Sequence, residues 1–479
     1  MARSALTGQL KRGTCLETAV HSGTTVSDLI DGRPFSKFQI GIVAQCGALI
    51  LLEGFAAQCI GFLAPGIAQD LSIPLKSFGP IFSAALAGLT IGALSCGPIA
   101  DRYGRKIVIV VSTLIFALFT ALTASAGSIH GLLMMRFLTG VGLGGAMPNA
   151  VALTAEYTPK RLQRVVVSAI FAGMPLGAST ASLVSTRMLP YWGWRSVFYL
   201  GGLLSLIIAV ILIKLLPESV KFLTATGADP RKVEVIIARM VPSTEGLTLR
   251  APVPSFEQES GLPIKHLFTK GRTVGTLLLW IAFFMNLLLL YFFVNWLPGL
   301  LTTVGMPISA GVMATGLFGL GGVIGSLVQG SLMNMRGSSA TILTEFLLCI
   351  VLITGLAYMK SFMVIMAATL ILGMVIQGAQ GGLNALSASF YPTTIRSTGV
   401  GWALGIGRLG SIIGPLVAGM MLGRGWTPPR IFLAGTVPAL IAALAVLLSS
   451  RMRNKPNPFR QKANPNQSAV CIDMENIST

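Results

Sequence analysis

Charged residues are scarce in this sequence. Only 11% of its 479 residues are Asp, Glu, Lys or Arg, whereas 53% are hydrophobic and the mean hydropathy is +0.76. Soluble globular domains carry about 25% charged residues. The composition therefore excludes an ordinary soluble globule and indicates a chain that crosses a membrane many times.

Cysteine and histidine are also too sparse to form a reactive or metal-binding cluster. The six cysteines form no CxxC pair, which argues against a zinc site and against a disulfide framework; they are Cys15, Cys46, Cys59, Cys96, Cys349 and Cys471. Of the three histidines, His21 and His266 lie outside the predicted spans, and His130 lies at the first residue of the fourth. Without a nucleophile paired with a base, the sequence does not favour an enzyme, and we expect no metal and no cofactor.

Long apolar runs dominate what is present. Twelve of them approach the roughly 20 residues that cross a bilayer core. They contain no alternating ten-residue strands, which favours helices over a barrel. We expect an all-α membrane protein with spans at about 39–62, 78–99, 107–126, 130–152, 164–186, 196–216, 273–297, 308–331, 340–359, 362–387, 398–421 and 431–450.

The net charge of +19 needs a location before it can be interpreted. With the spans above, about 27 of the 35 Lys and Arg residues fall on one side of the membrane, as the positive-inside rule requires of the cytoplasmic side. Both termini are then expected to be cytoplasmic. Topology and contact with anionic lipid headgroups explain this charge better than nucleic-acid binding does.

The segment GPIADRYGRK, from Gly97 to Lys106, packs an acid, three cations and two glycines between the second and third spans. Such a charged run cannot lie in hydrocarbon, so it predicts a tight hairpin on the cytoplasmic side. A similar frame, GSLMNMRG, begins at Gly330, at an offset of 233 from Gly97. YP at 391–392 and GW at 425–426 repeat YTP at 157–159 and GW at 193–194, at offsets of 233 and 232.

These matches at nearly the same offset predict a duplicated six-helix unit, and hence two pseudo-symmetric six-helix bundles. The polar stretch between the sixth and seventh spans separates them, with a short helix expected at 230–240. The expected segments are a cytoplasmic N-terminal tail (1–37), an N-terminal bundle (38–216), a cytoplasmic linker (217–272), a C-terminal bundle (273–450) and a cytoplasmic C-terminal tail (451–479). The tail at 1–37 has no signal-peptide core, so the first span is expected to direct insertion.

Three charged residues fall deep inside predicted spans: Glu53 in the first, Arg136 in the fourth and Arg408 in the eleventh. Burying such a charge costs several kcal/mol unless it is paired, so each is a candidate functional residue. Glu53 and Arg136 lie at comparable depths and could face each other. A purely structural ion pair between them is the alternative.

Uncharged polar residues also occur inside the second half, and they are candidate ligand-binding residues. They are Asn286 and Tyr291 in the seventh span and Gln377 and Gln380 in the tenth.

With these features the chain resembles the major facilitator superfamily, whose best-known loop motif is similar to GPIADRYGRK. Within it, RFLTGVGLGGAMPNAVALTAEYTPKRLQR, GMPLGA, GWRSVFYLGG with LPES, and YPTTIRSTGVGWALGIGRLG resemble the aromatic acid:proton symporters. That resemblance implies uptake of a small aromatic carboxylate with protons, by a monomer that contacts only membrane lipids besides its substrates.

The resemblance also implies roles for individual residues. Glu53 stands where the family has the first acid of a DGxD motif, but Ala56 replaces the second, which implies a low proton stoichiometry. Arg136 and Arg408 would hold the substrate carboxylate, since a guanidinium can bind both of its oxygens. The implied gating motif, with Asp101 as a latch beside a helix N-terminus, comprises Gly97, Asp101, Arg102, Gly104, Arg105, Glu156 and Arg396.

Three functions are therefore compared. A proton-coupled importer of a benzoate, hydroxybenzoate or phenylpropanoate is favoured. An efflux antiporter of the same fold for another organic anion is the alternative, although GMPLGA on the fifth span lacks the GP-rich antiporter pattern. A membrane enzyme is the least supported.

Overall fold

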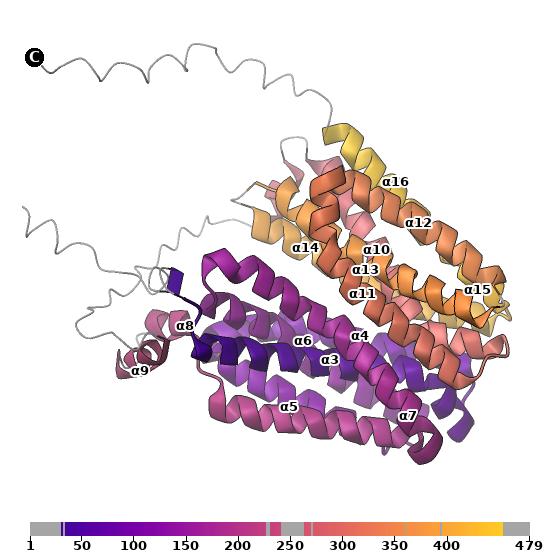
Figure 1. Ribbon diagram of the computed structural model, residues 1–479, viewed down its shortest axis with the longest axis horizontal. Helices are drawn as coiled ribbons and strands as arrows, with labels where there is room; N and C mark the ends of the chain where they lie inside the picture. Colours follow the sequence, from indigo (N-terminus) through magenta and orange to yellow (C-terminus); the bar gives the residue numbers. More distant parts are fainter. Residues whose placement is uncertain are drawn as a thin grey trace, which may run out of the picture.

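The computed structural model describes residues 30–31, 34–226, 230–240, 263–269, 272–359, 361–392 and 395–453. Within these ranges all regular structure is helical, and the long helices lie in two groups that are inclined to each other, α3–α7 below and α10–α16 above in Figure 1. The first half contains α3 (Lys37–Asp70), α4 (Phe78–Tyr103), α5 (Arg105–Thr123), α6 (Ile129–Tyr157) and α7 (Lys160–Leu215), with the short 3-10 helix Leu75–Ser77 before α4.

Two short helices, α8 (Val220–Ala225) and α9 (Pro230–Met240), follow the first half, and α9 confirms the helix expected at 230–240. A 3-10 helix, Pro263–Phe268, precedes the second half. The second half contains α10 (Thr273–Thr303), α11 (Ile308–Arg336), α12 (Ser338–Tyr358), α13 (Phe362–Phe390), α14 (Arg396–Gly423), α15 (Pro428–Ala434) and α16 (Thr436–Arg453).

Eleven helices in the described ranges are long and apolar enough to cross a membrane. One of them, α7, has 56 residues and is interrupted at Gly193, whose φ of 69° is non-helical. The kink divides α7 into two helices, one before and one after Gly193, and each exceeds the roughly 20 residues that cross a bilayer core. It therefore supplies two spans, and the twelve expected crossings are confirmed.

The first span is longer than the sequence predicted. Helix α3 continues from 62 to Asp70, through Pro65, because Leu63, Ala64 and Ile67 in this extension are buried against other helices. Glu53 consequently lies at the middle of α3, deeper than the predicted span placed it.

The repeat is visible in the backbone. Gly104 and Gly337, which correspond to each other in the repeat, end α4 and α11 with φ of 99° and 83°. Gly193 and Gly425, from the repeated GW pairs, also have positive φ. Glycine adopts this left-handed region without steric cost, so the turns of both halves depend on the same glycine positions.

Small residues allow the helices within each half to approach closely. A Cβ atom at Gly140 or Gly144 of α6 would collide with the backbone of α4 at Ala85 or Leu89. In the second half, a Cβ atom at Gly373 of α13 would collide with Phe318 of α11. The glycines of the fourth span are therefore packing residues, as expected for a membrane helix.

The two halves are joined at one end of the bundle. We call the end that holds Arg102, Arg105 and Lys106 the basic end; Ser83 and Ser179 lie about 30 Å away from it along α4 and α7, at 1.5 Å per residue. There the Ser83 hydroxyl donates to the Ile412 carbonyl at 2.6 Å, and the Ser179 hydroxyl is shared between the Gly316 carbonyl and the Pro175 carbonyl of its own helix, each at 3.0 Å.

These two hydrogen bonds occupy equivalent positions in the repeat. Positions 83 and 316 differ by the repeat offset of 233, and so do positions 179 and 412. The serine donor stands at position 83 in one bond and at the repeat equivalent of position 412, namely 179, in the other. The helix pairs and their register are nevertheless equivalent. The Ser182 hydroxyl adds a third bond, to the Val312 carbonyl at 2.7 Å. We call these three hydrogen bonds the hydroxyl seal.

Removing Ser83 and Ser179 together should favour opening at the sealed end. Each hydrogen bond contributes about 0.5–1.5 kcal/mol, so the double alanine variant should shift the equilibrium by about 5–150-fold. The measurement is the rate at which Leu86→Cys, buried below the seal, reacts with an impermeant thiol reagent in a chain without other cysteines.

The matched control is Thr180→Ala, because that hydroxyl bonds to Gly177 within its own helix. Equal labelling rates in the double variant and the control would contradict a role for the seal.

Candidate functional site

Glu53 occupies the interior of the first half. The residue is 2% exposed, and its Oε1 atom has no hydrogen-bond partner in the described structure. It lines a narrow cavity of about 20 Å³, which is room for about one water molecule. Arg408 of α14 lines the same cavity from the second half.

The cavity walls come from four helices of the first half. They include Ala57 of α3, Leu89 of α4, Pro148 of α6 and Met174 of α7. Because these walls are apolar, Glu53 and Arg408 are the groups that determine its charge. A carboxylate and a guanidinium in such a dry site attract each other much more strongly than in water.

Glu53 and Arg408 face one cavity without forming a direct ion pair. Within 4 Å, the ion pairs found among the described residues join Arg105 to Glu156, Lys160 to Asp31 and Arg195 to Asp70. Glu53 and Arg408 therefore remain free to bind something else, such as a proton or a second carboxylate.

Arg136 has a different environment. It is fully buried, and its Nη2 atom donates to the carbonyls of Ala56 at 2.8 Å and Ala57 at 3.3 Å. Its guanidinium also lies 5.9 Å from the centre of the Phe198 ring, a cation–π distance. Its Nε and Nη1 atoms have no partner among the described residues.

The structure thus places Glu53 and Arg408 at one cavity, whereas the Arg136 side chain binds the backbone carbonyls of α3. The alternative of a permanent Glu53–Arg136 ion pair is wrong for this conformation. Depth along each helix did suggest that the two could meet, but depth does not fix the direction in which a side chain points from its helix.

Polar residues of the second half form a short chain of hydrogen bonds. Asn286 donates to Gln380 Oε1 at 2.8 Å, and Gln380 donates to Asn384 at 3.4 Å. The Oδ1 atom of buried Asn286 has no partner in the described structure. Gln377 packs against Gly322 of α11 instead.

Tyr291 lies between the halves. It forms an apolar cluster with Leu86 of α4 and Leu287 of α10, and Ile412 packs against this cluster. Ile412 also accepts the hydrogen bond from Ser83. Tyr291 is therefore placed directly under the hydroxyl seal.

The expected gating residues gather at the basic end. Arg105 forms an ion pair with Glu156 at 2.6 Å, and Glu156 also accepts a hydrogen bond from Ser219. Gly97 and the exposed Arg102 lie nearby on α4. The exposed Arg396 begins α14, where it donates to its own half, to the Tyr391 carbonyl.

Glu218 is a site residue that the sequence did not reveal. Its Oε1 atom accepts backbone N–H bonds from Arg105 at 2.8 Å and Lys106 at 3.1 Å, which lie at the N-terminus of α5. A side chain at Gly104 would collide with this carboxylate. Glu218 thus occupies the helix N-terminus expected for Asp101, which is exposed at the end of α4. The LPES segment was the available signal, but its partners belong to a helix far away in the sequence.

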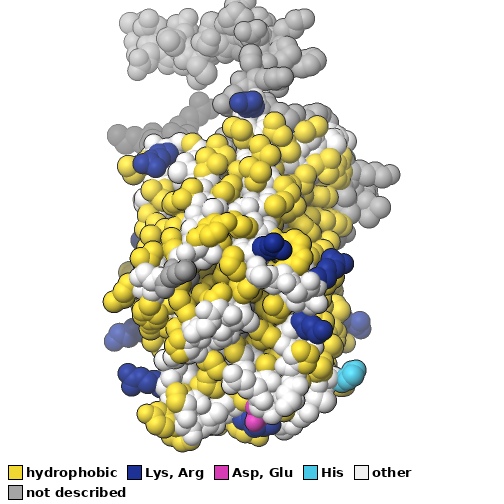
Figure 2. Space-filling model, turned by 90° about the vertical axis from the view of Figure 1, so that its right-hand side faces the viewer, with side chains coloured by type: hydrophobic (Ala, Val, Ile, Leu, Met, Phe, Trp, Pro, Cys, Tyr) yellow, Lys and Arg dark blue, Asp and Glu magenta, His cyan; other side chains and the backbone are white. Residues whose placement is uncertain are grey.

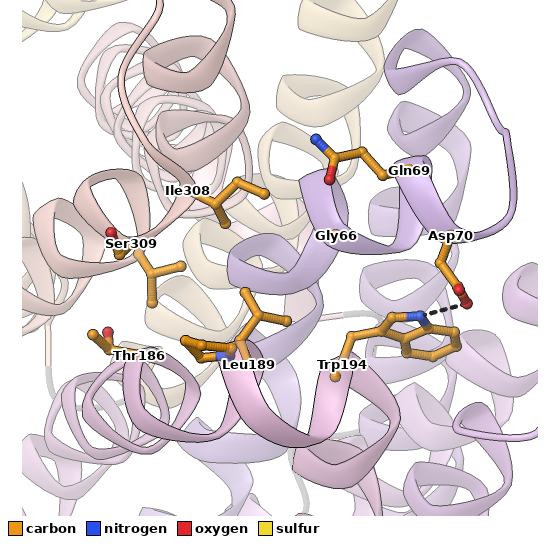
Figure 3. A pocket seen from close by; sticks show the side chains of 11 residues that line it. Gly66, Gln69, Asp70, Thr186, Leu189, Trp194, Ile308 and Ser309 are labelled. Atoms are coloured by element: carbon orange, nitrogen blue, oxygen red, sulfur yellow. Dashed lines mark hydrogen bonds between the residues drawn. The ribbon is translucent and has the colours of Figure 1, made fainter.

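A larger cavity of about 670 Å³ opens at the sealed end (Figure 3). Gly66, Gln69 and Asp70 of α3 line it together with Ile308 and Val312 of α11, so it lies between the halves. Val312 also takes part in the hydroxyl seal, which places the seal at the edge of this cavity.

The charge in this outer cavity is already compensated. Asp70 accepts hydrogen bonds from Trp194 at 3.0 Å, drawn as a dashed line in Figure 3, and from Arg195 at 2.6 Å. Figure 2 shows one end face of the molecule, on which Lys and Arg stand singly among hydrophobic and uncharged atoms. The described part of this face therefore offers no continuous basic surface.

Comparison with known proteins agrees with this architecture. The model of the Major Facilitator Superfamily matches residues 46–415. A crystal structure of a bacterial homologue of the human lysosomal transporter Spinster, in an inward-facing conformation, superposes with a TM-score of 0.68 at 16% identity, covering 88% of this chain and 100% of that one. At this identity the likeness concerns the fold alone.

Sequence relatives are more informative. The chain is 38% identical to the 4-hydroxybenzoate transporter PcaK of Pseudomonas aeruginosa, over 88% of this chain and 95% of the relative. It is 37% identical to the gallate transporter of Pseudomonas putida, over 92% and 99%. It is 35% identical to the 3-(3-hydroxy-phenyl)propionate transporter of Escherichia coli, over 86% and 95%.

Replacing Glu218 by alanine should destabilise the basic end. The change removes the acceptor at the N-terminus of α5, and loss of a helix cap costs about 0.5–2 kcal/mol. Thermal unfolding of the protein in detergent measures the effect, with Asp101→Asn as the control because Asp101 is exposed. If both variants unfold at the same temperature as the wild type, Glu218 does not stabilise α5.

Proposed function

Because the chain belongs to the Major Facilitator Superfamily, we propose that it imports an aromatic carboxylate together with protons by alternating access. It is a multi-pass membrane transporter closely related to the aromatic acid transporters, not an enzyme. The relatives' names support a benzoate, hydroxybenzoate or phenylpropanoate as the class of substrate.

The observation that carries the proposal is the cavity shared by Glu53 and Arg408. One residue comes from each half, so a carboxylate bound there would bridge the two halves once the cavity, of about 20 Å³ in this conformation, widens to admit it. In this proposal the Arg408 guanidinium binds the substrate carboxylate with two parallel hydrogen bonds. Such a contact at the interface favours a closed, substrate-loaded state.

Proton coupling follows from competition for Arg408. When Glu53 is ionised, its carboxylate and that of the substrate both compete for this guanidinium. A second carboxylate in a dry cavity is unfavourable because like charges repel strongly there. Protonation of Glu53 removes the competitor and leaves Arg408 for the substrate, so proton and substrate bind together.

The arene would lie against Tyr291 and Leu86, which pack together in this conformation and would have to separate to admit it. In this arrangement the unpartnered Oδ1 atom of Asn286 accepts a bond from a ring hydroxyl. Gln377 and Gln380 would supply further hydrogen-bonding groups beside Asn286. A buried acceptor left without its donor costs about 1–3 kcal/mol, so hydroxylated arenes should bind more tightly than benzoate.

Arg136 can contribute in two ways. In this conformation it holds the backbone of α3 one turn from Glu53, through the carbonyls of Ala56 and Ala57. Its free Nε and Nη1 atoms could reach a substrate carboxylate only if α3 and α6 shift. We propose that Arg136 binds the substrate carboxylate in another conformation, the one that is open at the sealed end.

The remaining assignments complete the transport cycle. Arg105, Glu156 and Glu218 would form the gate at the basic end, with Asp101 exposed beside them in this conformation, and we place this end in the cytoplasm together with both termini. The protein would act as a monomer in a bacterial inner membrane. Bundles at 38–216 and 273–450 move relative to each other about the shared cavity.

Replacing Arg408 by lysine should weaken substrate binding. Lysine keeps the charge but loses the two-pronged contact, and a hydrogen bond to a charged group contributes about 1.5–3 kcal/mol. We expect KM for a labelled 4-hydroxybenzoate or gallate to rise at least about tenfold. Arg195→Lys, at the outer cavity, is the matched control. Unchanged affinity in Arg408→Lys would remove its role as carboxylate ligand.

Replacing Glu53 by glutamine should separate exchange from accumulation. The amide resembles the protonated acid, so substrate still binds, but no proton can be released. Uphill uptake driven by a pH gradient in vesicles should be lost, while counterflow between labelled and unlabelled substrate persists. Full accumulation would refute the coupling role. Export driven by an inward proton gradient in the wild type would instead support the antiporter alternative.

A further inference from the structure

A second buried acid lies outside the shared cavity. Glu345 is the only charged residue of α12, and the residue is 9% exposed. It lies about 10 Å along the helix from Ser338 at the basic end, at 1.5 Å per residue. The transport mechanism above does not use it.

The side chain of Gln329 on α11 is its hydrogen-bond partner. Gln329 Nε2 donates to Glu345 Oε2 at 3.3 Å. Gln329 is itself buried, at 4% exposure, and its Oε1 atom has no donor among the described residues. Gln329 therefore makes one hydrogen bond to Glu345, while its own buried oxygen, Oε1, accepts none.

Helix α13 leaves a gap for these two groups. A Cβ atom at Gly378 would lie 3.0 Å from Glu345 Oε1 and 3.1 Å from Gln329 Oε1, so both free oxygens border the same gap. A Cβ atom at Gly382 would lie 2.5 Å from Gln329 Nε2. Three helices thus enclose a carboxyl group and an amide whose free oxygens face the same glycine, Gly378.

Among the described residues, no cation compensates this carboxyl group. Arg336 of α11, Arg430 of α15 and Arg451 of α16 belong to the helices packed on or near it, but all three are exposed. Helix α13 contains no charged residue, and the other buried titratable group on α12 is the thiol of Cys349. An ionised Glu345 would therefore carry its charge in the membrane interior with a single hydrogen bond, from the Gln329 amide.

We propose that Glu345 and Gln329 form a second proton-binding site, in which the protonated carboxyl group donates to Gln329 Oε1 while accepting from Gln329 Nε2. A carboxylate can only accept hydrogen bonds, so it would leave the Gln329 oxygen unpaired. The protonated acid satisfies both groups through a reciprocal pair. The orphaned acceptor and the gap at α13 are thereby explained together.

The site is connected to the seal through α11. This helix carries both Gln329 and, about 20 Å away along its axis at 1.5 Å per residue, Gly316, whose carbonyl binds Ser179. Loss of the proton would leave a buried charge that is relieved only when α13 separates from α11 and α12. Proton binding at Glu345 therefore favours the conformation described here, independently of Glu53.

Infrared difference spectroscopy of the full chain in lipid vesicles tests the site directly. The background is Glu53→Gln, so failure of the proposed coupling residue cannot affect the result. We expect a carboxylic-acid C=O band at neutral pH that disappears when Glu345→Gln is added. Asp101→Asn, an exposed acid, is the control and should leave the band unchanged. If Glu345→Gln removes only a carboxylate band, the site is not protonated and the proposal fails.

Two further variants test the partner and the consequence. Gln329→Leu should shift the frequency of that band, because the acid loses its hydrogen bonds; an unshifted band would exclude Gln329 as the partner. In the same Glu53→Gln background, labelling of Leu86→Cys should accelerate as pH rises, and Glu345→Gln should remove this pH dependence. Persistence of the dependence would contradict the link to the seal.

Discussion

The low dielectric of the membrane interior is the constraint on which this structure depends, because every charge placed there needs compensation. The chain meets it differently at each position. Arg136 uses backbone carbonyls of α3 and an aromatic ring. Glu53 and Arg408 share one cavity from opposite halves. A group that depends on the other half for compensation is sensitive to how the halves are arranged, which is the property a coupled transporter requires.

Close helix contact is the second requirement, and it explains how the repeat could diverge without losing its geometry. At the hydroxyl seal, Ser83 and Ser179 stand on opposite members of equivalent helix pairs. Each donates to a backbone carbonyl, and every residue has one. Selection therefore needs a small hydroxyl on either helix of the pair, so the donor can change sides while the register is conserved.

The sequence predicted those features that depend on local pattern. Apolar runs located the twelve spans, and the repeated glycines located turns that have positive φ at Gly104 and Gly337. Features that depend on helix rotation were not predictable: depth along the helices suggested that Glu53 could face Arg136, whereas the structure places Arg408 in the Glu53 cavity. Glu218 was missed for a related reason: its role comes from the N-terminus of α5, far away in the sequence.

The two ends of the molecule are held together by different kinds of interaction. At the sealed end, among the described residues, neutral hydroxyl bonds join the halves. At the basic end, the ion pairs of Arg105 with Glu156 and Lys160 with Asp31 stay within the first half. Neutral bonds of about 0.5–1.5 kcal/mol each are comparable with the energy that one carboxylate–arginine contact supplies. A substrate bound at Arg408 can therefore shift the balance between the ends, whereas a seal of buried ion pairs would resist it.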